Sequence, residues 1–300
     1  MKHIRIISPS GAIDSSYIQD AVARLSGWGY RVTEGRYARG RKGRFSGTDE
    51  ERLADIVDAL QDPDIDYVLC SRGGYGLQRI IDCVLSECPA NKGQALPKII
   101  GFSDITELHQ WSLLNSRESL HGLMCKHLSQ LPEDSEMIIH WRNAVEGKTL
   151  HYNIPAHSLN RNGNVEGTLI GGNLSVLYGL QATPLGLLEL PCFCNDKAKP
   201  ILFIEDIAER HYHIDRMMNN LKMSGVLAQL GGLIVGQFAD CEDDESMGET
   251  IYETVRRAVE EYGYPVLFDF PAGHVERNLP LWLGKKTSLT VSNECGIVEQ

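Results

Sequence analysis

Strand-like and helix-like segments alternate along the first 130 residues of this chain, and this alternation restricts the possible fold more than any other feature. Residues 4–7, 67–70 and 97–100 are short apolar runs with the composition of buried strands. Between them lie stretches with helical apolar spacing, one of which opens with a capping-box sequence at residues 48–51. Because parallel strands are joined by crossover helices, the pattern predicts an α/β fold with a Rossmann-like parallel sheet.

Two unusual turns follow predicted strands of this sheet. Residues 72–76, Arg-Gly-Gly-Tyr-Gly, follow the run at 67–70, and Gly101-Phe102-Ser103-Asp104 follows the run at 97–100. In parallel sheets the ligand site lies at the carboxyl ends of the strands. A serine on a strand-to-helix turn presents its hydroxyl beside backbone amides, so Ser103 is a candidate nucleophile, although the tetrad lacks the second glycine of a G-x-S-x-G elbow.

The glycine-rich turn has three possible uses. Glycine lets a backbone amide approach a ligand closely, so the turn could cradle a phosphate, but it matches neither common phosphate-binding motif. It could instead form an oxyanion hole from the amide of Gly74 (or Gly73) together with that of Asp104. It could also be no more than a tight turn.

The second half of the chain contains a second set of strands. Residues 136–165 are rich in polar, turn-forming side chains and predict a connection between an N-terminal domain at 1–135 and a smaller C-terminal α/β domain at 166–300. Residues 201–204 and 233–235 predict buried strands, and the alternation at 287–291 is typical of an edge strand.

A serine nucleophile needs a base and a group that orients the base, and the C-terminal half offers one candidate for each. Glu205 directly follows the buried strand at 201–204, where a carboxylate is held rigidly; it could also form a salt bridge with Arg210 or Arg216. His274 lies in a proline- and glycine-containing loop, where it could be a catalytic base or only a hydrogen-bonding residue. These residues together indicate a serine hydrolase.

Composition excludes several other classes of protein. The formal net charge of -11 argues against a nucleic-acid-binding surface. The apolar run at the beginning of the sequence is too short for a secretory signal and no stretch is long enough to span a membrane, so we expect a cytoplasmic location. Cys192 and Cys194, a pair separated by one residue, lack zinc-site spacing, and we expect reduced thiols, no metal and no cofactor.

Other polar features keep two explanations each. The basic stretch from Arg39 to Arg44 could bind an anionic ligand, but such stretches are usually solvated loops. Asn173, at a predicted helix start, could bind substrate or cap the helix. His211 and His213 are two residues apart on a predicted helix and therefore point apart, which is unsuited to a shared metal.

Five blocks of the sequence together resemble the LD-carboxypeptidase family, the serine peptidases of the muramoyltetrapeptide carboxypeptidase type. The resemblance runs in order over nearly the whole chain, from about residue 6 to 291. The blocks are Ser71-Arg72-Gly73-Gly74-Tyr75-Gly76, Gly101-Phe102-Ser103-Asp104-Ile105-Thr106, Gly171-Gly172-Asn173-Leu174, Ile204-Glu205-Asp206 with Ile214-Asp215-Arg216-Met217, and Gly273-His274 with Asn278.

The resemblance implies a cytoplasmic, homodimeric serine carboxypeptidase that hydrolyses an L,D-peptide bond and releases the terminal D-alanine of a murein tetrapeptide during cell-wall recycling. It implies Ser103 as nucleophile, His274 as general base and acid, and Glu205 as the orienting carboxylate, assembled across the interface of the two domains. We expect the amides of Gly74 and Asp104 to hold the oxyanion, and Arg72, Tyr75 and Asn173 are candidates for substrate binding.

Two other functions remain open at this point. The same family includes immunity peptidases that cleave a peptidyl-nucleotide antibiotic, but these carry asparagine and serine after the glycines, where this chain has Gly-Gly-Tyr-Gly. The third possibility is a non-catalytic protein that binds a small ligand at residues 72–76. The sequence does not identify the third residue of the peptide substrate or the dimer surface.

Overall fold

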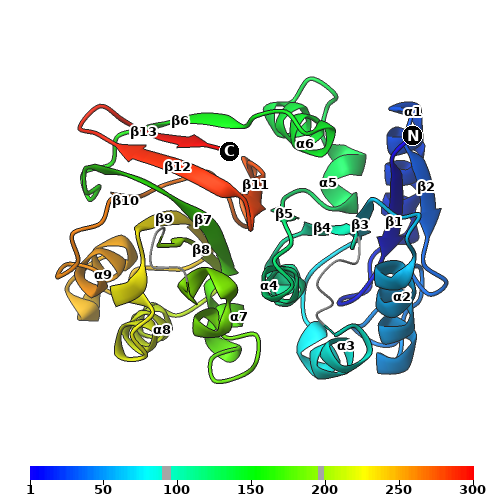
Figure 1. The fold of residues 1–300 in the computed structure, drawn as a ribbon, viewed down its shortest axis with the longest axis horizontal. Helices are drawn as coiled ribbons and strands as arrows, with labels where there is room; N and C mark the ends of the chain where they lie inside the picture. Colours follow the sequence, from blue (N-terminus) through cyan, green and yellow to red (C-terminus); the bar gives the residue numbers. More distant parts are fainter. Residues whose placement is uncertain (90–95, 195–198) are drawn as a thin grey trace. The chain divides into compact units, whose positions relative to one another are not determined.

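The computed structural model describes residues 1–89, 96–194 and 199–300, which form two compact units, Met1–Arg142 (unit 1) and Asn143–Gln300 (unit 2) (Figure 1). Both units are mixed α/β structures that contain parallel strands, which confirms the predicted fold class. The boundary between the units falls within helix α6 (Glu136–Glu146).

Unit 1 is built around a parallel sheet. Its strands lie in the order β5-β4-β3-β1-β2, and each neighbouring pair is parallel. The strands are β1 (His3–Ile7), β2 (Arg31–Glu34), β3 (Tyr67–Cys70), β4 (Lys98–Gly101) and β5 (Ser119–His121). The helices are α1 (Ser15–Gly27), α2 (Asp49–Gln61), α3 (Ile81–Glu87), α4 (Thr106–Leu114) and α5 (Cys125–Gln130), with short 3₁₀ turns η1 (Leu77–Arg79) and η2 (Ser103–Ile105).

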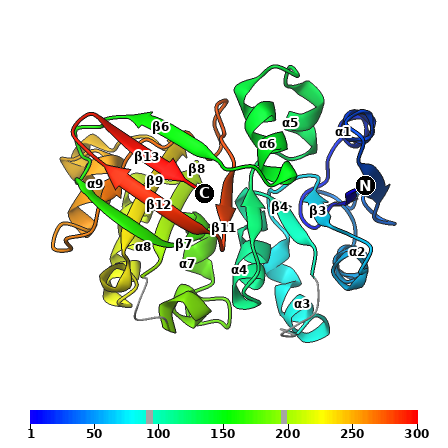
Figure 2. The ribbon, with the colours of Figure 1, turned by 45° about the horizontal axis from the view of Figure 1, so that its top comes forward.

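Helices cover both faces of the unit 1 sheet, as its almost wholly buried central strands require. Helices α1 and α5 lie on one side and α2 and α3 on the other (Figures 1 and 2). Strand β1 is the point at which the order of strands reverses, because β2 lies on one side of it and β3 on the other. The carboxyl ends of β1, β3 and β4 therefore meet at one edge, where such sheets bind ligands.

Unit 2 contains a mixed sheet in the order β10-β9-β8-β7-β12-β13-β6. Strands β7 to β10 are joined by parallel pairs, and β7, β12, β13 and β6 by antiparallel pairs. The strands of unit 2 are β6 (His151–Pro155), β7 (Gly163–Asn173), β8 (Ile201–Ile207), β9 (Gly232–Ala239), β10 (Val266–Leu267), β11 (Leu281–Leu283), β12 (Lys286–Val291) and β13 (Cys295–Glu299). Its helices are α7 (Leu174–Gly179), α8 (His211–Met223) and α9 (Ile251–Ala258), with 3₁₀ turns η3 (Leu187–Glu189), η4 (Pro191–Cys194), η5 (Leu227–Gln229) and η6 (Glu245–Met247).

Two segments of the chain differ from the sequence-based expectation. Residues 136–165, expected to be a connection, contain α6, strand β6 and the start of β7; in β6 the side chains of Tyr152 and Ile154 alternate with exposed ones, a pattern hidden by the neighbouring turn residues. Strand β12 was expected at an edge but lies between β7 and β13, so that prediction was wrong. A half-polar strand can lie inside an antiparallel sheet, because one face of such a sheet can remain exposed.

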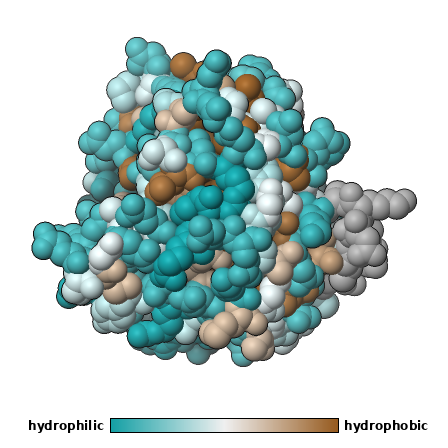
Figure 3. Space-filling view, turned by 90° about the vertical axis from the view of Figure 1, so that its left-hand side faces the viewer, coloured by the Kyte–Doolittle hydropathy of each residue, from teal (hydrophilic) through white to brown (hydrophobic). Residues whose placement is uncertain are grey.

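The face drawn in Figure 3 is mostly hydrophilic, with apolar residues in small separate patches. None of the helices in the described parts of the chain has the length and hydropathy needed to cross a membrane.

Candidate active site

Ser103 occupies a strained turn at the carboxyl end of β4. It is the first residue of η2, and α4 follows directly. Its φ angle is 68°, in the left-handed region that residues with a Cβ atom rarely adopt. A half-buried serine with a strained backbone, between a strand and a helix, has the local geometry of a nucleophile elbow even without the second glycine.

The glycine loop (residues 72–76) packs directly against this serine. A Cβ atom added at Gly73 would lie 2.8 Å from the Cβ of Ser103 and 3.0 Å from the carbonyl oxygen of Phe102, so a side chain at this position is excluded. Gly74 has a φ angle of 105°, and its N–H donates to no residue that the structure describes. An amide that is free of internal partners is what an oxyanion hole requires.

The carboxylate of Asp104 is used within the fold. Its Oδ2 accepts a hydrogen bond from the N–H of Leu77 at 3.0 Å, which ties the end of the glycine loop to the turn that carries Ser103. Burial raises the pKa of Asp104, while its hydrogen bonds and nearby arginines act in the opposite direction. Only the backbone amide of Asp104 is therefore a candidate for contact with substrate.

Arg52 holds the other end of the loop, and its part in the site could not be foreseen from a motif. The guanidinium is 1% exposed, and its Nη1 donates to the carbonyl oxygens of Gly76, at 2.9 Å, and Pro9. Its Nη2 donates to Oδ1 of Asp49 at 2.6 Å. The sequence signal for its burial was helical spacing, because Arg52 lies on the same buried face of α2 as Ile56.

The three candidates for substrate binding lie in different environments. Nη1 of Arg72 donates to the carbonyl oxygen of Ala12 at 2.8 Å. The side chain of Tyr75 is 43% exposed. Asn173 is buried and caps α7, because its Oδ1 accepts from the N–H of Val176 at 3.2 Å. The capping explanation for Asn173 is thus realised in the structure.

Glu205 and His274, 69 residues apart, meet in unit 2. Nδ1 of His274 lies 2.8 Å from Oε2 of Glu205, whose side chain is fully buried. Glu205 lies within β8, which continues to Ile207 and not only to residue 204 as expected. Because a carboxylate can only accept, Nδ1 carries the proton, and Nε2 remains the basic nitrogen. Burial lowers the pKa of His274, but the hydrogen bond and charge of Glu205 outweigh it, and the net shift is upward.

Only glycine fits beside this pair. Gly273 has a φ angle of 130°, and a Cβ atom there would lie 2.9 Å from Oε2 of Glu205. The N–H of Gly273 donates to Oδ1 of Asn278 at 3.1 Å, which holds the loop that carries His274. The motif that contains Gly273, His274 and Asn278 is therefore one hydrogen-bonded loop.

Asp206, next to Glu205, organises the start of α7. Its Oδ1 accepts from Nδ2 of Asn173 at 2.9 Å, and its Oδ2 accepts from the N–H of Ser175 at 2.8 Å. Strand pairing places Asn173 opposite Glu205. Burial, with a further contribution from the charge of Glu205, raises the pKa of Asp206 to about 7.

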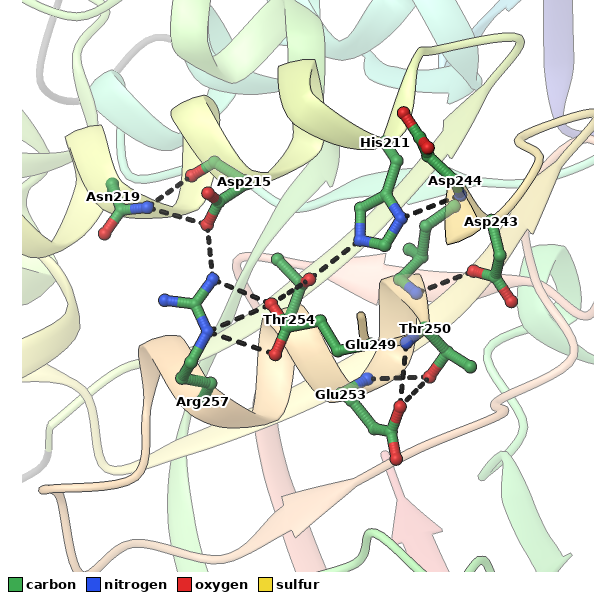
Figure 4. A network of polar contacts seen from close by, with 11 residues as sticks. His211, Asp215, Asn219, Asp243, Asp244, Glu249, Thr250, Glu253, Thr254 and Arg257 are labelled. Atoms are coloured by element: carbon green, nitrogen blue, oxygen red, sulfur yellow. Dashed lines mark hydrogen bonds and ion pairs between the residues drawn. The ribbon is translucent and has the colours of Figure 1, made fainter. Parts of the chain in front are cut away.

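A second buried polar network lies around His211 (Figure 4). The N–H of Asp244 donates to Nδ1 of His211 at 3.2 Å, and Nε2 lies 2.8 Å from Oγ1 of Thr254. Thr254 in turn donates to Glu249, which pairs with Arg257. Both ring nitrogens of His211 are therefore occupied: Nε2 joins α8 to α9, and Nδ1 joins α8 to the residue that precedes η6.

Glu107 is a further buried acid that the sequence analysis missed. It lies on α4, is 1% exposed, and its Oε2 has no hydrogen-bond partner in the described parts of the chain. Burial raises its pKa to about 9, with a smaller contribution from Asp104. Helical spacing alone gave no signal, because every residue from Thr106 to Leu113 is buried.

No metal centre is evident in what the structure describes. Across residues 1–89, 96–194 and 199–300, no group of three or more His, Cys, Asp or Glu side chains is arranged to hold a metal ion. The side chain of Cys194, one of the close cysteine pair, lies outside the described part of the chain.

Comparison with known protein families gives two matches along the chain. Residues 4–122 match the LD-carboxypeptidase N-terminal domain, and residues 166–289 match the LD-carboxypeptidase C-terminal domain. A solved structure, of muramoyltetrapeptide carboxypeptidase from Oxalobacter formigenes, matches with a TM-score of 0.84 at 27% identity over 99% of this chain and 98% of that chain.

Several named proteins are similar to this chain over at least four fifths of their length. A Bacillus subtilis protein named "Probable murein peptide carboxypeptidase" is 30% identical over 99% of this chain and 91% of its own. The murein tetrapeptide carboxypeptidase of Pseudomonas aeruginosa is 29% identical over 97% of this chain and 93% of its own. The Microcin C7 self-immunity protein MccF of Escherichia coli is 27% identical over 85% of this chain and 80% of its own.

Proposed function

The chain belongs to the LD-carboxypeptidase family, and we propose that it is a serine peptidase that releases the terminal D-alanine from a murein tetrapeptide by hydrolysing an L,D-peptide bond. The hydrogen bond between Glu205 and His274 carries the proposal, because an imidazole oriented by a buried carboxylate is the base that a serine nucleophile needs. The murein tetrapeptide and murein peptide carboxypeptidases among its relatives support this substrate.

In the proposed mechanism, Oγ of Ser103 attacks the carbonyl carbon on the acyl side of D-alanine. Nε2 of His274 takes the serine proton and then gives it to the leaving amino group, which breaks the C–N bond and leaves an ester on Ser103. Water, deprotonated by the same nitrogen, hydrolyses the ester and restores the serine. Glu205 keeps the imidazole in the required tautomer and stabilises its charged form.

The negative oxygen of the tetrahedral intermediate needs two donors. We assign them to the amide of Gly74, which follows the glycine packed against Ser103, and to that of Asp104, the residue after the serine. Among the side-chain candidates for substrate contact, the exposed ring of Tyr75 is best suited, since Asn173 is occupied as a helix cap and Arg72 binds a backbone carbonyl.

The decisive experiment is incubation of the protein with a murein tetrapeptide, followed by mass spectrometry for loss of one alanine. The Ser103→Ala variant should remain folded and show no turnover. Near-normal release of D-alanine by this variant would contradict the mechanism.

The alternatives are tested with the same proteins. An aminoacyl-nucleotide amide offered in parallel should be cleaved far more slowly than the tetrapeptide; the reverse order would identify an immunity peptidase. Ser103-dependent turnover of either compound contradicts a purely binding function. The homodimeric state and cytoplasmic location also stay predictions, and light scattering of the purified protein tests the first.

A further inference from the structure

The segment between β2 and α2 concentrates positive charge in an acidic protein. Residues 35–44 hold five arginine or lysine side chains and no acidic one, whereas the whole chain has a net charge of -11. Arg39 forms a bidentate pair with Glu34, at 2.6 and 2.9 Å. Neither Arg41 nor Arg44 forms an ion pair with any residue that the structure describes. The segment therefore carries cations without an ion-pair partner among the described residues, although the charge of Arg44 is felt by the buried carboxylate of Asp104.

Backbone hydrogen bonds place Arg44 next to the nucleophile turn. The N–H of Ala12 donates to the carbonyl oxygen of Arg44 at 2.9 Å, and the N–H of the preceding Gly11 donates to that of Gly73 at 3.1 Å. Gly73 is the residue in contact with Ser103. One short piece of chain after β1 thus joins the basic segment to the serine.

The side chain of Arg44 lies over an exposed ring. Its guanidinium carbon is 5.6 Å from the centroid of the Tyr75 ring, and Tyr75 is itself supported by Phe45, with the two centroids 6.1 Å apart. A guanidinium held over an aromatic face keeps its N–H groups available at the edge, in the planar fork that fits a carboxylate. This arrangement orders the arginine before any ligand binds.

Other arginines around the glycine loop are already engaged. Arg72 donates to the carbonyl oxygen of Ala12, and Arg79 pairs with Oδ2 of Asp49 at 2.8 Å. Arg44 is the arginine near Ser103 that, within the described residues, has an aromatic support but no oxygen partner. It is therefore better suited than Arg72 to receive an anionic group.

We propose that Arg44, supported by Tyr75, binds a carboxylate of the peptide substrate and determines specificity for acidic peptides. The inference rests on the proposed function, since a peptide cut by a carboxypeptidase carries at least its terminal carboxylate. A protein with a large negative charge repels such a peptide at long range, and a local cation beside the nucleophile counteracts this.

The test is steady-state kinetics of D-alanine release by Arg44→Gln and by the matched control Arg41→Gln. Both variants remove one unpaired charge from the same exposed segment. Loss of a charge-assisted pair should raise KM for Arg44→Gln by about 10- to 100-fold with little change in kcat. Arg41→Gln should stay within about threefold of the natural protein, as expected for an exposed charge that has no contact with the Tyr75 ring. No change in Arg44→Gln, or equal changes in both variants, would overturn the proposal.

A conservative variant tests the geometry of the contact. Arg44→Lys keeps the charge but loses the planar fork, so it should recover only part of the lost affinity. Full recovery of affinity in Arg44→Lys would show that a point charge is enough to bind the carboxylate, and it would contradict a bidentate contact with Arg44.

The source of the carboxylate is identified with modified peptides. The terminal carboxylate is removed in a tetrapeptide amide, and a side-chain carboxylate is present or absent in two probe peptides that carry diaminopimelate or lysine at the third position. Binding of each peptide is measured by calorimetry in Ser103→Ala, with and without Arg44→Gln. If a carboxylate contacts Arg44, then in the peptide that lacks this carboxylate Arg44→Gln should no longer weaken binding. If Arg44→Gln weakens the binding of both modified peptides as much as that of the unmodified peptide, the proposal is wrong.

Failure of this inference is separable from failure of the proposed function. If the natural protein releases D-alanine and Arg44→Gln matches it, the function stands and the carboxylate site is wrong. If the natural protein releases none, the proposed function fails, and this inference fails with it.

Discussion

Nδ1 of His274 lies 2.8 Å from Oε2 of Glu205, a carboxylate with no exposed surface. The contact joins a strand end to a loop 69 residues later, and both positions are held by hydrogen bonds or close packing around Gly273. Such a pair gives the imidazole one tautomer and raises the affinity of its other nitrogen for a proton, which is the property on which the proposed catalysis depends.

Replacement of Glu205 by glutamine should keep the shape of the buried side chain and remove its charge. We expect kcat to fall on the order of 10³- to 10⁴-fold, as for loss of an orienting carboxylate in other serine hydrolases. Burial would then lower the pKa of His274 against only the smaller opposing charges of Asp206 and Asp240. Since His274 must be neutral to act as a base, the acid limb of the kcat/KM profile should move to lower pH. A limb that stays in place would contradict the assigned roles.

Replacement of Gly73 by alanine should disturb the nucleophile. The new Cβ atom would lie 2.8 Å from the Cβ and 3.2 Å from the Oγ of Ser103, so the serine must shift. Because misplacement of reacting atoms by about 1 Å can cost on the order of 100-fold in rate, kcat should fall strongly. Gly27→Ala is the control, since nothing lies within 4 Å of a Cβ atom there. Equal activities of the two variants would contradict the contact.

Replacement of Arg52 by methionine should loosen the glycine loop. The carbonyl oxygens of Gly76 and Pro9 would lose a buried donor, which we expect to lower the free energy of unfolding by about 2–4 kcal/mol. Amides 73–77 should exchange with deuterium faster. The control Arg79→Met removes a half-exposed arginine that shares the Asp49 contact. Matching exchange rates in both variants would rule out a positioning role for Arg52.

Replacement of Glu107 by glutamine should change how stability depends on pH. Burial raises the pKa of the folded carboxyl from 4.5 to about 9. Between these values the unfolded chain releases the proton and the folded chain keeps it, so the group destabilises the fold increasingly as pH rises. The natural protein should lose about 1.4 kcal/mol of unfolding free energy per pH unit relative to the variant. Urea unfolding of both proteins at pH 5, 6.5 and 8 measures this difference in unfolding free energy. The prediction is wrong if the unfolding free energies of the two proteins change with pH in the same way.

Several parts of this protein follow from local sequence signals. The box at Thr48 and Glu51 was predicted from spacing, and both of its hydrogen bonds are present, because a capping box involves residues only three apart. The position of Ser103 just after a strand was also predicted, since a run of buried residues and the turn that ends it are neighbours in the chain. Glu205 was expected directly after a strand but lies within β8, which continues to Ile207, so that boundary was wrong.

Other features depend on partners that are distant in sequence, and only the tertiary structure decided them. Helical spacing places Arg52 on the buried face of α2, but the carbonyls that accept its hydrogen bonds come from two other loops. Likewise, the alternation in β12 predicts a strand but not its place between β7 and β13. The turn that begins at Gly101 and carries Ser103 can therefore be predicted from the sequence. Which residues pack around that turn cannot be predicted in this way. Periodicity records which side of an element is buried, and long-range packing selects what lies against that side.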